Sequence, residues 1–306
     1  MRVLVSGASG LVGSALVPAL ESAGHSVVRL VRRDPAPNEI RWDPAKDPPL
    51  ATPAKGGAPE TGVFEGFDAV VHLAGESIAG RWTAVKKARI RDSRVQGTSA
   101  LARALARSQR PPKVFVCASA IGIYGDRADE VLREESASGS DFLAEVGKQW
   151  EAATEPASKA GIRVISLRIG VVLSAHGGAL AQMLPPFRMG VGGRIGNGRQ
   201  WMSWIALDDL VGVIQHALAT DALRGPVNTV APNPVTNAEF TSALGQALHR
   251  PTILPLPAFM VRLIFGEMGE ALLLSSQRVD CSKLLSSGYR FRHAELKPVL
   301  EALLAA

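Results

Sequence analysis

The sequence RVLVSGASGLVG, from Arg2 to Gly13, is a short apolar run that leads directly into a loop with three glycines. The first glycine of such a loop allows a tight turn, the second lets the backbone approach a pyrophosphate, and the third lets a helix pack on a strand. Free N–H groups at the start of the following helix then bind phosphate. A simple tight turn is the alternative, but the position between an apolar strand and an amphipathic run favours a dinucleotide loop. Its predicted contacts are Gly7, Ser9, Gly10, Leu11, Val12 and Gly13.

Two arginines follow the next apolar run, at the position that decides between NAD and NADP. NAD-binding units usually carry an acidic residue about 20 residues past the glycine loop, where it binds the ribose 2′-hydroxyl. Here the chain reads Arg32, Arg33 and Asp34. Two planar guanidinium groups suit a 2′-phosphate, so the sequence favours NADP(H). Asp34 as the ribose acid, or a merely solvated arginine pair, are the alternatives.

Short β-branched runs alternate with helical spacing through the first half of the chain, which predicts an α/β fold with a doubly wound parallel sheet of the Rossmann type. The long Pro-, Gly- and Ala-rich stretch from Asp34 to Gly66 is expected to be mostly loop. The expected strands are Arg2–Val5, Ser26–Val31, Glu39–Trp42, Ala69–Leu73, Lys113–Ala118, Arg163–Arg168 and Pro226–Val230, and the expected helices are Leu11–Ala23, Arg94–Ser108, Asp141–Lys159 and Leu207–Ala219.

The texture of the sequence changes after the last of the regular alternations. Residues 177–198 are rich in glycine, and prolines interrupt the helical patterns after residue 250. We therefore expect an NADP-binding domain over residues 1–232, whose segment 175–205 contributes to the substrate side. A smaller C-terminal subdomain is expected over residues 233–306.

Composition limits the partners of this 306-residue chain. The net charge is +6, but the cations are scattered and only 5% of residues are aromatic, which argues against nucleic-acid binding. No apolar run reaches the roughly 20 residues that span a membrane. Two cysteines and no leader pattern predict a reducing cytoplasm. The six histidines show no metal-ligand spacing. We expect a cytoplasmic monomer or homodimer with a small-molecule substrate.

Several motifs carry a family resemblance over nearly the whole chain. They include SGASGLVG from Ser6, HLAGE from His72, ASAIGIYG from Ala118, LRIGVVLS from Leu167 and SSQRVDCSKLLSSGYRF near the C-terminus. With these motifs the sequence resembles the extended and atypical short-chain dehydrogenases/reductases of the NAD-dependent epimerase/dehydratase superfamily. Within that superfamily it is similar to epimerase-like oxidoreductases with a C-terminal DUF1731 domain. The resemblance implies an NADP(H)-dependent oxidoreductase or epimerase-like protein.

The resemblance also implies further cofactor contacts. Trp42 matches a position on the adenine side, Arg94 matches a position near the nicotinamide end or the pyrophosphate, and Val171 is expected near the carboxamide. Trp42 as plain core and Arg94 as a helix-surface charge are the alternatives. The turn expected to line the ribose is Leu73, Ala74 and Gly75, followed by Glu76, which faces the site or is a polar loop residue.

The catalytic pattern of the family is incomplete. Its members use a serine after the fifth strand and a Tyr-x-x-x-Lys pair that passes a proton. Ser119 matches the serine, but the tyrosine and lysine positions fall on Leu143 and Gly147. Tyr124 is the one tyrosine nearby, and it either takes part in catalysis or packs in its loop.

Two functions remain open on this sequence. The first is an NADP(H)-dependent enzyme in which Ser119 polarises a carbonyl of a substrate lying between residues 190–198, Trp201, Trp204 and the C-terminal subdomain. The second is a non-catalytic NADP(H)-binding protein, a redox sensor or a partner-binding protein. Loss of the Tyr-Lys pair favours the second function, and the intact pocket segments favour the first.

The arginine pair gives a direct test of cofactor choice. Replacing Arg32 and Arg33 together by alanine is expected to weaken NADPH much more than NADH, because only NADPH carries the 2′-phosphate. Fluorescence titration of the variant with each nucleotide measures the effect. Equal losses for both nucleotides would contradict the assignment.

Overall fold

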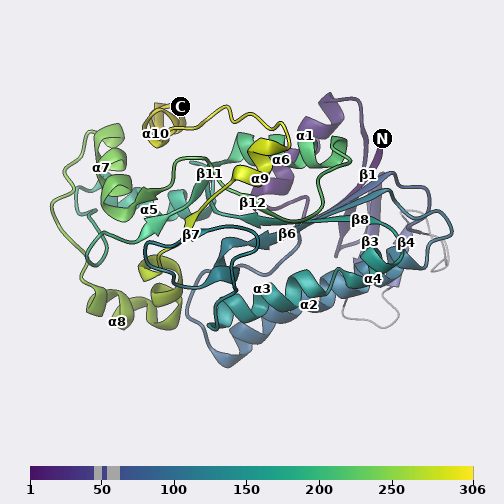
Figure 1. The fold of residues 1–306 in the computed structure, drawn as a ribbon, viewed down its shortest axis with the longest axis horizontal. Helices are drawn as coiled ribbons and strands as arrows, with labels where there is room; N and C mark the ends of the chain where they lie inside the picture. The colour runs from purple at the N-terminus through teal and green to yellow at the C-terminus, as the bar shows by residue number, and fades with distance from the viewer. Residues whose placement is uncertain (45–49, 54–62, 306) are drawn as a thin grey trace.

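A computed structural model describes residues 1–44, 50–53 and 63–305, and its centre is an eight-stranded sheet in the order β12-β8-β6-β5-β1-β2-β3-β4 (Figure 1). Every neighbouring pair is parallel except β3 with β4. The predicted Rossmann-type, doubly wound α/β fold is confirmed. The strands are β1 (Arg2–Ser6), β2 (Ser26–Val31), β3 (Glu39–Asp43), β4 (Leu50–Pro53), β5 (Ala69–His72), β6 (Val114–Ala120), β8 (Arg163–Ile169) and β12 (Gly225–Thr229).

The strand order reverses next to β1. From β1 the chain builds outward through β2 and β3, and it then returns to the other side of β1 to add β5, β6, β8 and β12. In open α/β sheets the crevice at such a switch point, outside the carboxyl ends of the strands, binds the ligand. The glycine loop follows β1 and therefore lies at this crevice.

Helices cover both faces of the sheet (Figure 1). On one face α1 (Leu11–Ser22) and α6 (Leu207–Ala219) pack against side chains such as Val3 and Val5. On the other face α2 (Ala84–Ala106), α3 (Phe142–Ala152) and α4 (Glu155–Lys159) cover alternate side chains such as Leu4. Because successive strand side chains point to opposite faces, one apolar run supplies both cores.

The later part of the chain gathers beyond the carboxyl ends of β6 and β8 (Figure 1). Here a third apolar cluster joins α5, α7 and α10. Since α5 and α7 share this cluster, the proposed boundary at residues 232/233 stays a prediction. The remaining elements are η1 (Ile121–Tyr124), β7 (Val131–Leu132), β9 (Val171–Leu173), α5 (Gly178–Arg188), β10 (Trp201–Met202), β11 (Trp204–Ala206), β13 (Val235–Thr236), α7 (Asn237–Leu248), α8 (Ala258–Gly269), η2 (Glu270–Leu274), β14 (Arg278–Val279), α9 (Ser282–Ser286) and α10 (Leu296–Ala305).

Three elements differ from the sequence expectations. Helix α2 begins at Ala84 rather than at Arg94, because Thr83 accepts a hydrogen bond from the Lys86 N–H and caps an earlier, strongly charged first turn. The helix expected over 141–159 is two helices, with Pro156 in the first turn of the second. Strand β4 lies within the expected loop, and residues 45–49 and 54–62 of that loop lie outside the described residues.

No helix in the described ranges is both long and apolar enough to cross a membrane. Likewise, no three His, Cys, Asp or Glu side chains in those ranges gather closely enough to hold a metal ion.

The packing of α1 on β1 can be tested at Gly13. A Cβ at Gly13 would lie 2.2 Å from the Gly7 carbonyl oxygen, so Gly13→Ala forces the helix away from the strand and should cost about 3 kcal/mol or more of unfolding free energy. Gly97→Ala is the matched control. Its added Cβ meets no atom within 4 Å, and alanine should stabilise α2 by up to about 1 kcal/mol. Urea unfolding compares the two, and a stable Gly13 variant would contradict this packing.

Candidate functional site

The glycine loop lies against the turn that follows β5. Gly7 has a positive φ of 71°, and a Cβ there would lie 2.7 Å from the carbonyl carbon of Leu73 and 2.8 Å from the Ala74 nitrogen. Only glycine allows both this backbone conformation and this close approach. The turns after β1 and β5, which are neighbours in the sheet, therefore form one continuous backbone surface at the switch point.

The first turn of α1 presents free backbone donors at this surface. Gly10 is the N-cap residue and offers no side chain to accept from the first N–H groups. Its own N–H donates to the Gly7 carbonyl at 3.0 Å, which closes the loop. The first turn contains no acidic residue. The N–H groups of Leu11, Val12 and Gly13 are therefore free to bind an anion at the positive end of the helix dipole, an arrangement that fits a pyrophosphate.

The two arginines after β2 have different surroundings. Arg33 donates two hydrogen bonds of 2.7 Å to Glu39, and a backbone hydrogen bond from Ala36 together with Arg33 lowers the pKa of this carboxyl. Arg32 is exposed and forms no ion pair with a described residue. Asp34 is paired with Arg41 at 2.9 Å. The Arg32 guanidinium is therefore available to a 2′-phosphate, whereas the Arg33 guanidinium is held by Glu39.

Arg94 projects from α2 onto the turn after β5. Its guanidinium donates to the carbonyl oxygens of Glu76 at 2.9 Å and Ile90 at 3.1 Å, and it lies 5.0 Å from the ring centre of Trp150. A Cβ on Gly75 would come within 3.3 Å of it. Burial lowers the Arg94 pKa to about 10, and no carboxylate of the described chain lies within 4.0 Å of the group. Desolvation outweighs the nearby Glu76 charge in setting this pKa, so the group is suited to receive an anionic ligand.

Glu76 follows this turn but is already engaged. Its carboxylate pairs with Lys86 at 2.7 Å, and this hydrogen bond lowers its pKa. Its backbone N–H donates to Ser93 Oγ. Glu76 thus anchors the start of α2 beside the crevice, and its contact with cofactor stays a prediction.

Ser119, the expected catalytic serine, points into the helix layer. Its side chain is 3% exposed, and its hydroxyl donates to Glu151 on α3 at 2.7 Å. The same carboxylate receives two hydrogen bonds from Arg168, of 2.8 and 2.9 Å. Burial would lower the Arg168 pKa, but the bonds to Glu151 outweigh it and raise that pKa. The neighbouring Ala120 is the exposed residue at the end of β6.

Tyr124 belongs to the same buried network. Its phenol has no exposed surface, donates to Asn228 at 2.6 Å and accepts from Arg168 at 2.9 Å. Burial raises its pKa. Sequence reasoning missed the Glu151–Arg168 pair, although an arginine at the end of an apolar strand was a signal that a buried carboxylate would be needed opposite it.

Helix α3 packs closely on η1 at the two positions where the family's tyrosine and lysine would lie. A Cβ at Gly147 would lie 3.0 Å from the Ile123 Cβ, and a Cβ at Gly122 would lie 3.5 Å from the Leu143 Cβ. Hydrocarbon and backbone therefore fill the space beside these two positions.

Trp42 is part of the core rather than an open surface. It is 4% exposed, and its ring lies edge-on to His72 at 6.1 Å. His72 Nδ1 shares a 2.6 Å hydrogen bond with Ser6 at the end of β1. Among described groups neither Trp42 Nε1 nor His72 Nε2 has a hydrogen-bond partner. A cofactor contact for Trp42 stays a prediction, and its packing matches the alternative that it is core.

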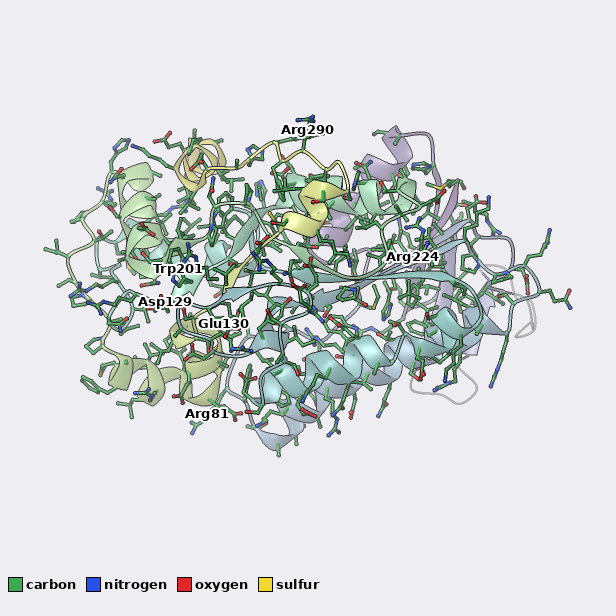
Figure 2. All side chains as sticks on the ribbon, viewed as in Figure 1. Arg81, Asp129, Glu130, Trp201, Arg224 and Arg290 are labelled. Carbon is green, nitrogen blue, oxygen red and sulfur yellow. The ribbon has the colours of Figure 1, made fainter. Side chains whose placement is uncertain are left out.

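The two tryptophans expected on the substrate side differ. Trp204 is completely buried and donates to the Asn233 carbonyl oxygen, so its expected substrate contact is wrong. The Trp204 ring packs in the third apolar cluster instead. Trp201 is half-buried on β10, and Figure 2 shows it beside Asp129. Val171 begins β9 just beyond β8, and its N–H donates to Ser203.

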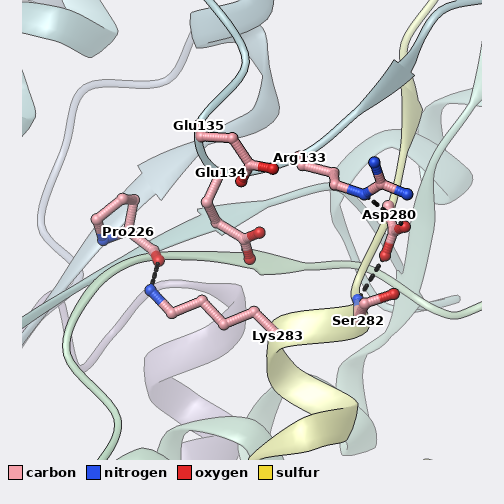
Figure 3. Close-up of a pocket in the computed structure, with 7 residues that line it drawn as sticks. All are labelled: Arg133, Glu134, Glu135, Pro226, Asp280, Ser282 and Lys283. Atoms are coloured by element: carbon pink, nitrogen blue, oxygen red, sulfur yellow. Dashed lines mark hydrogen bonds and ion pairs between the residues drawn. The ribbon is translucent and has the colours of Figure 1, made fainter.

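A separate cavity of about 400 Å³ lies toward the amino end of β12 (Figure 3). Lys283 crosses it and donates to the carbonyl oxygens of Arg224 and Pro226 at 2.9 and 2.6 Å. Burial lowers the Lys283 pKa. These hydrogen bonds attach α9 to β12 and give the cavity a structural role. None of the residues that line it belongs to the glycine loop. Its lining residues are Arg133, Glu134, Glu135, Pro226, Asp280, Ser282 and Lys283.

Known proteins share this arrangement. The NAD dependent epimerase/dehydratase family model matches residues 3–229, and that of the domain of unknown function DUF1731 matches residues 256–303. The epimerase family protein Mb2239 of Mycobacterium bovis is 45% identical over 298 residues, covering 95% of this chain and 93% of its own.

Two solved structures are also similar. The human epimerase family protein SDR39U1 (isoform 2), crystallised with NADPH, is 36% identical with a TM-score of 0.88, covering 100% of this chain and 99% of its own. A nucleoside-diphosphate sugar epimerase from Corynebacterium glutamicum is 39% identical with a TM-score of 0.78, covering 99% of this chain and 58% of its own.

The burial of His72 predicts a pH dependence of stability. Burial lowers its pKa from 6.5 to about 4, so below about pH 6.5 the unfolded chain takes up a proton that the folded chain refuses. Unfolding free energy should therefore fall by about 3 kcal/mol on this account as the pH drops from about 6.5 to 4. His72→Asn should remove this share of the slope, whereas His249→Asn, at an exposed position, should keep it. Urea unfolding across this pH range measures both, and equal slopes would refute the assignment.

Proposed function

Because this chain belongs to the NAD dependent epimerase/dehydratase family, we propose that it binds NADP(H) between β1 and β5 and acts as an oxidoreductase or epimerase-like enzyme on a small molecule. The observation that carries the proposal is the approach of Gly7 to the Leu73–Ala74 backbone beside the uncapped start of α1. This cradle fits a pyrophosphate, and a Cβ at either Gly7 or Gly13 would fill it. The similar human protein was crystallised with NADPH.

The proposed contacts divide along the cofactor. The first turn of α1 holds the pyrophosphate, and Arg32 holds the 2′-phosphate. Arg94 supplies a cation at the turn after β5, near the pyrophosphate or the nicotinamide end. Val171 borders the carboxamide. Support for Arg94 comes from its desolvation and from its lack of a carboxylate partner in the described chain.

When bound, NADPH supplies a hydride. This chain offers no tyrosine–lysine relay beside it, since Leu143 and Gly147 stand at those positions. The Ser119 proton is directed to Glu151, so Ser119 can polarise a substrate carbonyl only after its hydroxyl turns away from that carboxylate. We propose that turnover depends instead on the placement of the substrate and on stabilisation of developing negative charge by Arg94.

A second candidate is an NADP(H)-binding protein without turnover, acting as a redox sensor or partner-binding protein. The observation that favours it is that Ser119 and Tyr124 are both buried and both engaged in the Glu151–Arg168 network. Under this hypothesis Ser119 and Tyr124 position β6 and η1 and meet no substrate. A cytoplasmic location and a monomeric or homodimeric state also remain predictions.

The deciding experiment has two stages. NADPH fluorescence is first titrated with purified protein, and saturable binding supports the cradle. The saturated complex is then incubated with a panel of carbonyl compounds while absorbance at the nicotinamide band is followed. Oxidation by any member supports the enzyme, whereas binding without oxidation across the panel supports the second candidate. No binding of either pyridine nucleotide would overturn both.

Arg94 offers a specific prediction within this scheme. Arg94→Gln should weaken NADPH binding by about 10- to 100-fold, the range expected for losing a charged hydrogen bond of about 1.5–3 kcal/mol. Arg91→Gln is the control, because Arg91 is an exposed residue on the same helix that pairs only with Asp92. Titration with NADPH measures both variants. Equal affinities for the two variants would show that Arg94 does not reach the cofactor.

A further inference from the structure

A second guanidinium at the carboxyl edge lies without a counter-ion. Arg278 on β14 stacks over the Trp201 ring, with 4.5 Å from its guanidinium carbon to the ring centre. No carboxylate of the described residues comes within 4.0 Å of it. The arrangement parallels that of Arg94 on Trp150, but it is built from a different part of the chain. Unlike Arg94, which donates to two carbonyl oxygens, Arg278 donates no side-chain hydrogen bond to another described residue.

Hydrogen bonds fix the Trp201 ring before any ligand arrives. The indole N–H donates to Asp129 at 2.9 Å, and the backbone N–H of Trp201 donates to Ser276 Oγ at 2.9 Å. Ser276 in turn donates to the Ala128 carbonyl oxygen at 2.5 Å. Ala128 has a positive φ of 47°, an unusual conformation for a residue with a Cβ. Three segments distant in sequence are thus held together around one small surface, which Figure 2 places beside the Trp201 and Asp129 labels.

This surface adjoins the end of the crevice where the substrate is expected. Gln277, next to Arg278, donates from its side chain to Gly125, the residue that ends η1 after β6. The Gln277 carbonyl oxygen accepts from Ser203 Oγ, and the Ser203 carbonyl oxygen accepts from the Val171 N–H. One hydrogen-bonded chain therefore links the neighbour of Arg278 to the strand assigned to the nicotinamide carboxamide.

The Arg278 guanidinium lies over the Trp201 ring and donates no hydrogen bond to another described side chain or carbonyl, so its N–H groups are available to a ligand. These groups form a planar fork that matches the two oxygens of a carboxylate or phosphate. The stack also removes side-chain freedom that would otherwise be lost on binding. A purely structural arginine at this position would be expected to pair with a carboxylate or with carbonyl oxygens, as Arg163 does on β8.

We propose that Arg278, held on Trp201, binds an anionic group of the substrate, a carboxylate or a phosphate. The inference rests on the proposed function, because it treats the crevice as a substrate site. It narrows the substrate class to small molecules that carry an anion at one end and the reacting carbon at the other. The positive charge of Arg278 is then neutralised by the substrate anion, and only when substrate is bound.

The test uses the full chain saturated with NADPH, so that the cofactor's own anion sites are filled. Inorganic phosphate and succinate are titrated separately into wild type, Arg278→Gln and the control Arg290→Gln, and binding is followed by calorimetry and by tryptophan fluorescence. Arg290 is exposed and lies apart from Trp201 (Figure 2). We expect saturable binding of at least one probe to wild type and to the control, and a loss of about tenfold or more in affinity for Arg278→Gln. Whichever probe binds tighter identifies the anion as phosphate or carboxylate.

Two results would overturn the proposal. The first is the absence of saturable binding of both probes to wild type, and the second is equal affinity of Arg278→Gln and wild type for the probe that binds. Arg278→Lys guards against a folding defect, since it keeps the charge and should retain partial binding. If NADPH itself fails to bind, the probes are titrated into the free protein. An Arg278-dependent component there would keep the anion site while removing the proposed function.

Discussion

The backbone contact between the glycine loop and the turn after β5 sets the spacing of everything at the carboxyl edge of the sheet. Gly7 lies where any side chain would collide with Leu73 and Ala74, and Gly13 lies where any side chain would push α1 off β1. Because neighbouring strands are held at a fixed spacing by their ladder, these two contacts leave one place for the start of α1. This placement sets where the free N–H groups of α1 lie. It also sets their position relative to the turn after β5 that Arg94 contacts.

The charged groups around this edge form two kinds of arrangement. Arg33 and Arg168 are satisfied by Glu39 and Glu151, and such pairs hold strands and helices in register. Arg94 and Arg278 instead rest on tryptophan rings and lack a carboxylate in the described chain. A structural pair is complete without ligand, whereas a guanidinium with no carboxylate in contact is open to an incoming anion. This contrast separates the residues that build the site from those proposed to use it.

The glycine loop and strand alternation predicted the sheet well, because three glycines between a strand and a helix and β-branched runs are local signals. The directions and contacts of individual side chains could be predicted less well. Ser119 follows the right strand, but its direction depends on Glu151, which is far away in sequence. Likewise Trp201 and Trp204 lie three positions apart and look alike in the chain, yet Trp204 fills a core formed by later helices. The burial and contacts of these residues depend on packing against distant parts of the chain. No periodicity or motif in the sequence predicts such packing.

The contact between Gly147 and Ile123 also limits which side chains α3 can carry beside η1. At 3.0 Å from an added Cβ, Ile123 has to shift before residue 147 can carry a side chain, and the same helix carries Glu151, which holds Arg168 and Ser119. A lysine at residue 147 or a tyrosine at residue 143 would therefore have to be accommodated together with the partners of Glu151. The packing of α3 on η1 thus couples any change at the relay positions to the buried hydrogen-bond network behind them.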